Sequence, residues 1–199
     1  MLKKQMTQYI TDALTVDAEK IELHPEEKGY AEKHQLIPTG IEVVEKESES
    51  RFADAYLERC EKATVALVLV ETPPFLNEKI NHLKRHDAEF LYLESKLFDI
   101  LGVDAISLEL DDVFGTYTAM FGLKLQKKHE VAIKDYLDRH LTGEDGKYSV
   151  VFSTKDGLWD MNFSLNYVDG FKADMTLLEA YNLIYTFIFS MIETIEETA

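Results

Sequence analysis

The chain has 199 residues, of which 46% are apolar, so it is long enough to bury a sizeable core. Its 37 acidic residues against 21 lysines and arginines give a formal net charge of -16 at pH 7. Such a charge repels phosphate backbones and anionic lipid headgroups, so we expect neither nucleic-acid nor membrane binding. The first residues lack the apolar core of an export signal, and a lone cysteine, Cys60, forms no internal disulfide. A cytoplasmic protein is therefore expected.

The N-terminal part of the chain is expected to be helical. Apolar residues at helical spacing predict an amphipathic helix over residues 2–14. Pro25, followed by two glutamates, is typical of the first turn of a short helix that reaches about His34. Residues 48–62 also favour a helix. The apolar run 63–70 fits either a helix or a strand, and we favour the helix.

Pro73-Pro74 is the strongest break in the chain, because neither residue can continue a helix interior. We therefore expect residues 1–74 to form a helical extension packed on a core made of residues 75–199. That core should begin with a long helix over residues 77–101, ended by Gly102 in the left-handed conformation.

From residue 106 onward, one strand-hairpin-helix pattern occurs twice. The second copy follows the first by 42 positions, as these pairs of identical residues show: Ser107 and Ser149, Gly115 and Gly157, Phe121 and Phe163, Leu123 and Leu165. Apolar and polar residues alternate over 106–111, 117–125, 148–152 and 159–167, which is typical of an antiparallel sheet covered on one side. Asp156-Gly157 is expected to supply the positive backbone angles of a tight hairpin turn.

A helix is predicted after each hairpin. Residues 129–141 carry an apolar stripe at spacings of three and four. Thr176 and Glu179 predict a capping box at the start of the second helix. Residues 180–192 of this helix are uncharged and apolar nearly all round, so we expect protein to cover it on more than one side. The predicted fold class is α+β: an antiparallel sheet of two tandem ββα units with helices on one face, preceded by a helical N-terminal segment.

The order of elements over residues 77–197 resembles the small chaperones of type III secretion, in which helices cover one side of a short antiparallel sheet in an acidic dimer. Separately, the stretches 51–60, 111–117 and 157–160 resemble a small family of Bacillus-type bacteria. Some of its members carry a branched-chain aminotransferase label, which implies a pyridoxal phosphate enzyme.

The residues do not support that label. A pyridoxal phosphate enzyme needs a lysine for the Schiff base and a cup of backbone amides, usually at a helix N-terminus, for the phosphate. The nearest turn is Gly143-Glu144-Asp145-Gly146, and its two acidic residues would repel a phosphate. We therefore expect no cofactor.

Two small groups of residues are candidate ligand sites. His82 and His86 stand four apart on a predicted helix and would share one face, so they could bind a metal ion, although we favour a solvated polar face as their explanation. Arg51, Tyr56 and Arg59 could clamp an anion between the N-terminal helices and the sheet.

The polar face of the predicted sheet is a candidate interaction surface. It is either plain solvent-facing surface or receives the N-terminal helices, a second subunit or a peptide. The residues concerned are Thr116, Thr118, Met120, Asp160, Asn162 and Ser164.

The acidic charge, the duplicated core and the lack of an assembled catalytic set favour a non-enzymatic protein-binding or chaperone-like module. We expect it to self-associate through the apolar excess of its last helix. The alternative is a small-molecule-binding protein or small enzyme that uses the Arg51, Tyr56 and Arg59 group.

Overall fold

The structure is a computed structural model that describes residues 1–143 and 146–198. The helices are α1 Leu2–Val16, α2 Pro25–Lys33, α3 His82–Arg85, α4 Phe98–Leu101, α5 Glu130–His140 and α6 Leu177–Thr198. The strands are β1 Lys20–Leu23, β2 Glu42–Glu45, β3 Tyr56–Glu61, β4 Leu67–Glu71, β5 Glu89–Glu94, β6 Val103–Leu110, β7 Tyr117–Leu123, β8 Tyr148–Ser153 and β9 Leu158–Ser164. Short 3-10 turns are η1 Ser48–Ser50, η2 Pro73–Asn77, η3 Lys127–His129 and η4 Leu165–Tyr167.

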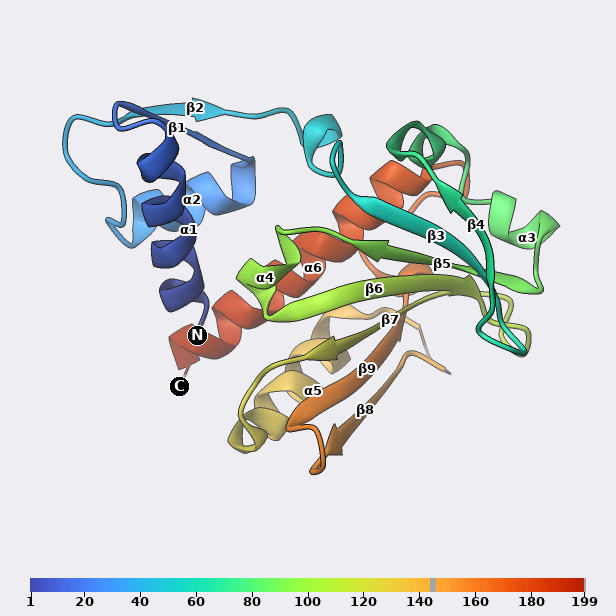
Figure 1. Ribbon diagram of the computed structural model, residues 1–199. Helices are drawn as coiled ribbons and strands as arrows, with labels where there is room; N and C mark the ends of the chain where they lie inside the picture. The colour runs from blue at the N-terminus through green and yellow to red at the C-terminus, as the bar shows by residue number, and fades with distance from the viewer. Residues whose placement is uncertain (144–145, 199) are drawn as a thin grey trace.

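Seven strands form one antiparallel sheet in the order β4-β3-β5-β6-β7-β9-β8. Two further strands, β1 and β2, form a separate parallel pair joined through α2. Figure 1 shows α1, α2 and this pair grouped to one side of the large sheet, with the start of α1 beside the C-terminal end of α6. The predicted α+β class is confirmed. Among the described residues, no helix combines the length and the apolar composition that crossing a bilayer requires.

The two predicted ββα units are present, and they are related by a pseudo-twofold axis. Their hairpins meet through the second strands, β7 and β9, and Met120 pairs with Asn162. These two residues occupy equivalent positions of the duplicated pattern, so the axis passes between them. The turns agree as well: the amide of Gly115 donates to Asp111 and that of Gly157 to Ser153, both at 2.8 Å.

Both turn glycines adopt positive φ, +64° at Gly115 and +69° at Gly157. Each is the residue that a left-handed backbone requires, because a side chain there would meet its own carbonyl. The expectation that Asp156 would share the positive angle is wrong, since Gly157 is the turn residue that has it. Gly102 also has positive φ, +69°, and ends α4 as predicted.

The inner face of the sheet packs on α6. Tyr117 and Trp159, which the duplication makes equivalent, are each 1% exposed and lie in the same sheet. Phe163 of β9 meets Phe187 of α6 at 4.8 Å between ring centroids, and Phe187 meets Tyr136 of α5 at 5.5 Å. The side chains of α6 that are buried inside this single chain are Leu177, Ala180, Tyr181, Ile184, Tyr185, Phe187, Ile188, Phe189, Met191, Ile192 and Ile195.

The capping box of α6 is confirmed. The Thr176 amide donates to the Glu179 carboxylate at 2.6 Å, and the Glu179 amide donates to the Thr176 hydroxyl at 3.1 Å. These bonds lower the pKa of Glu179 and satisfy two amides that the first turn leaves free.

Three predictions of helix are wrong. Residues 48–62 contain η1 and strand β3, residues 63–70 lead into strand β4, and residues 77–101 contain β5 between the short helices α3 and α4. Strands β3 and β4 lie before Pro73-Pro74 in the chain and β5 lies after it, yet β3 pairs with β5 in the same sheet. The residues before the proline pair are therefore not an all-helical extension, because they supply two of the seven strands.

A buried ionic network joins α2, the turn at η1 and α6. The Arg51 guanidinium pairs with Glu26 and, at 2.7 Å, with Glu27, and it lies 4.1 Å from the ring centroid of Tyr185. The Tyr185 hydroxyl donates to Glu27 as well. Because Arg51 and Glu27 are almost completely buried, each depends on the other to offset the loss of water.

We expect Arg51→Met to lower the free energy of unfolding by about 3–5 kcal/mol, because it leaves the buried Glu27 carboxylate without its cation. Urea denaturation measures this loss. The matched control is Arg85→Met, since the Arg85 side chain is 60% exposed and its contact with Glu78 is 3.8 Å. The control should change stability by less than about 0.5 kcal/mol. Equal effects of the two substitutions would contradict this account of the network.

His24 should make stability depend on pH. Its side chain is buried, and burial is the main cause that lowers its pKa from 6.5 to about 4. The unfolded chain binds a proton that the folded chain excludes, so the contribution of His24 is complete above pH 6.5 and is lost as the pH falls toward 4. Urea denaturation over this range should show a decline about 3 kcal/mol smaller in His24→Leu than in the wild type. Parallel declines would refute this.

Candidate functional site

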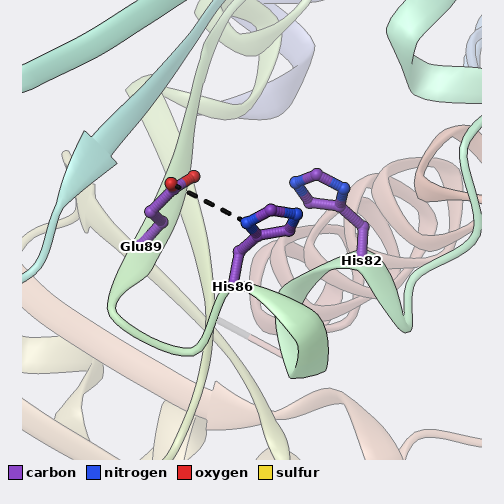
Figure 2. Close-up of side chains that lie close together, drawn as sticks. All are labelled: His82, His86 and Glu89. Atoms are coloured by element: carbon purple, nitrogen blue, oxygen red, sulfur yellow. Dashed lines mark ion pairs between the residues drawn. The ribbon is translucent and has the colours of Figure 1, made fainter.

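A histidine pair and a carboxylate lie together where α3 leads into β5. The rings of His82 and His86 stack with centroids 4.3 Å apart, and His86 Nδ1 lies 4.0 Å from Glu89 Oε1. Figure 2 shows a nitrogen of His82 facing His86, with Glu89 on the far side of the His86 ring. One donor atom from each of the three residues lies within 4.8 Å of the other two.

Packing around α3 fixes this arrangement. Ile80 and Leu83 are fully buried, and the Ile80 amide donates to the Met175 carbonyl at 2.9 Å, just before α6. Phe75 of η2 places its ring edge-on to His82 at 5.0 Å. His82 is consequently only 7% exposed, and its Nε2 has no hydrogen-bond partner among the residues that the structure describes.

Arg59 of β3 holds the carboxylate of the cluster. Its Nε donates to Glu89 at 2.8 Å and its Nη2 donates to the other Glu89 oxygen at 3.0 Å. Its Nη1 donates to Glu71, the last residue of β4, at 3.2 Å. The hydrogen bonds from Arg59 lower the pKa of Glu89, so this carboxylate is ionised at neutral pH. Burial is the main cause that lowers the pKa of His82.

The arrangement therefore offers two imidazoles and one anionic carboxylate around a common point. His82 and His86 are the predicted metal candidates, and the structure brings them together, but His82 begins the four-residue helix α3 and His86 follows its last residue, whereas one long helix was expected. The third member, Glu89, belongs to a strand that follows the histidines. Because a helix is predicted over residues 77–101, the sequence does not predict this strand.

The predicted anion clamp is not assembled. Arg51 is engaged with Glu26 and Glu27, and Arg59 with Glu71 and Glu89. Tyr56 lies on the same strand as Arg59 but three positions earlier, so the two side chains leave opposite faces of the sheet. The turn weighed as a phosphate cup, residues 143–146, has Glu144 and Asp145 outside the described residues.

The predicted interaction surface is present in part. Thr118, Met120, Asp160 and Asn162 lie on the outer face of β7 and β9, where Met120 pairs with Asn162. Thr116 and Ser164 are 8% and 1% exposed, so these two members are buried and are not available to a partner.

Strand β4 is an exposed apolar edge strand in a segment for which the sequence pattern favours a helix. Its residues Leu67, Val68, Leu69 and Val70 are each 46% to 54% exposed. It pairs with β3 along one side, and along the other it pairs with no strand of residues 1–143 and 146–198. Because both faces of β4 are apolar, it lacks the alternation that identifies a strand half-buried on a core.

Comparison with known proteins found no match among protein-family models, curated proteins or solved structures. The resemblances to type III secretion chaperones and to the Bacillus-type family therefore stay predictions.

Proposed function

We propose that this protein is a non-enzymatic, cytoplasmic protein-binding module that assembles by pairing strand β4 with β4 of a second copy. The observation that supports the proposal is the exposed edge of β4, in which Leu67, Val68, Leu69 and Val70 are aliphatic and the last residue, Glu71, is paired with Arg59. An unpaired strand edge presents a row of backbone donors and acceptors, which is a template for another strand.

The composition of the edge makes it fit for pairing. Residues 63–70 carry no charge, although 29% of the chain is charged, and only Lys62 and Glu71 flank the run. Natural proteins protect free edges with charged side chains, prolines or bulges. Here the irregular pairing beside Val68, between Leu67 and Leu69, is the one such device within β4, and the apolar side chains around it stay exposed.

A second copy supplies the matching chemistry. In a twofold dimer each copy presents the same patch, so the patch must be complementary to itself. The aliphatic residues 67–70 of β4 meet that condition, because antiparallel pairing centred on them opposes aliphatic side chains and no like charges. The net charge of -16 is spread over the rest of each copy. Salt screens the repulsion between exposed charges that lie more than about 10 Å apart.

The energetics predict a reversible dimer. Fully burying a valine or leucine contributes about 1.5–3 kcal/mol, so the exposed half of each β4 side chain contributes about 1 kcal/mol. Four such side chains in each of two copies give about 8 kcal/mol, which is within the range of about 4–15 kcal/mol that association costs. Backbone hydrogen bonds between the strands then decide the affinity.

Helix α6, the surface first expected to drive association, does not support it. Its apolar side chains are buried in the core of a single copy. Pairing along β4 instead joins two seven-stranded sheets with their outer faces on the same side. Thr118, Met120, Asp160 and Asn162 of both copies then lie on one continuous surface, which is where we place a protein or peptide partner.

Sedimentation over a concentration series into the tens of micromolar tests the proposal. The wild type should form a dimer, and Val68→Lys should be monomeric at every concentration, because it places two cations in the contact. The matched control is Val151→Lys on β8, the opposite edge of the sheet, where the valine is 58% exposed against 48% for Val68. The control should dimerise as the wild type does, and urea denaturation should show that all three chains are folded.

A monomeric wild type, or a dimer that Val151→Lys breaks and Val68→Lys leaves intact, would overturn self-pairing at β4. A monomeric wild type that instead binds a labelled peptide of residues 63–72 in solution would assign the edge to a strand from another protein.

A further inference from the structure

The Nε2 atom of His82 is buried and lacks a hydrogen-bond partner among the described residues. The His82 ring is buried to 93%, since 7% is exposed. A buried polar atom without a partner destabilises a folded protein. In Figure 2 a nitrogen of the His82 ring faces His86, and the two rings stack with centroids 4.3 Å apart.

The three donors are close enough to share an ion. They lie within 4.8 Å of one another, whereas donors around a tetrahedral zinc ion with bonds of 2.0–2.1 Å are about 3.4 Å apart. The His86 side chain is 41% exposed, so its ring can turn when an ion binds. The same exposure gives an ion in solvent access to the site.

The local charge favours a cation. Arg59 contributes one positive charge, and its two partners, Glu71 and Glu89, contribute two negative ones. Arg59 uses one lone pair on each Glu89 oxygen, and a carboxylate has about four such sites, so Glu89 can bind a metal while Arg59 still orients it.

We propose that His82, His86 and Glu89 bind one divalent transition-metal ion of the zinc class. Two imidazoles with one carboxylate suit zinc, cobalt or nickel, whereas calcium and magnesium take oxygen donors almost alone. Three protein donors leave one position of a tetrahedral ion open to water. The bound ion joins α3 to β5, two elements that are otherwise connected here by the short turn at residues 86–88.

Isothermal titration of the purified chain with zinc chloride tests the site, and cobalt absorption reports the coordination geometry. The wild type should bind one ion per chain, with a cobalt spectrum typical of a four-coordinate ion. His86→Gln should weaken zinc binding by at least about tenfold. Because the His86 side chain is half exposed, its replacement should leave the fold intact, which circular dichroism and urea denaturation check. His82→Gln should have the same effect on binding.

The matched control is His34→Gln. His34, Glu193 and Glu197 form the other group of metal-ligand type among the described residues, but Lys33 pairs with both glutamates there. This control should bind zinc as the wild type does. The proposal is overturned if the wild type binds no zinc at millimolar concentration, if His86→Gln binds as tightly as the wild type, or if His34→Gln alone removes binding.

Discussion

The packing of α6 against the inner face of the sheet is the interaction on which the rest of the structure depends. The helix is apolar nearly all round, so strands, α5 and the N-terminal elements must cover it from several directions. This packing brings the ends of the chain together, since the amine of Met1 pairs with Glu196 of α6 and the Tyr30 hydroxyl of α2 donates to the same carboxylate at 2.7 Å. The same packing places Arg51 and Glu27 in the interior, where their ion pair offsets the loss of water.

The C-terminal half could be predicted because several local signals agree there. Alternation predicts the strands, the turn glycines mark the hairpin turns, and the Thr176 capping box marks the start of α6. The strands nearer the N-terminus could not be predicted in this way. In β5, Phe90 stands seven residues from both Leu83 and Leu97, which imitates a helical stripe, and in β4 exposure of both faces removes the alternation. Only pairing with distant strands shows that these segments are extended.

The candidate sites also contain some residues that a local sequence pattern predicts and others that only the fold brings into place. Two histidines four residues apart are a local pattern, so His82 and His86 could be identified from the sequence. Glu89 and Arg59 join them through strand pairing and tertiary contact. Arg51 and Arg59 looked available for a ligand, because a sequence does not show which carboxylates a guanidinium meets in the fold. The exposed edge depends on strand order, which places β4 last in the sheet.

The pseudo-twofold axis between Met120 and Asn162 separates two kinds of constraint within one duplicated unit. Several equivalent positions that point inward stay large and apolar, as Phe121 and Phe163 or Tyr117 and Trp159 do, since both halves line one interior. Some equivalent positions that point outward differ in chemistry, as threonine at 118 and aspartate at 160 do, whereas Ser107 and Ser149 are identical. The two halves of the open face therefore differ chemically at positions 118 and 160, so that a ligand lying across the axis meets a different side chain on each side.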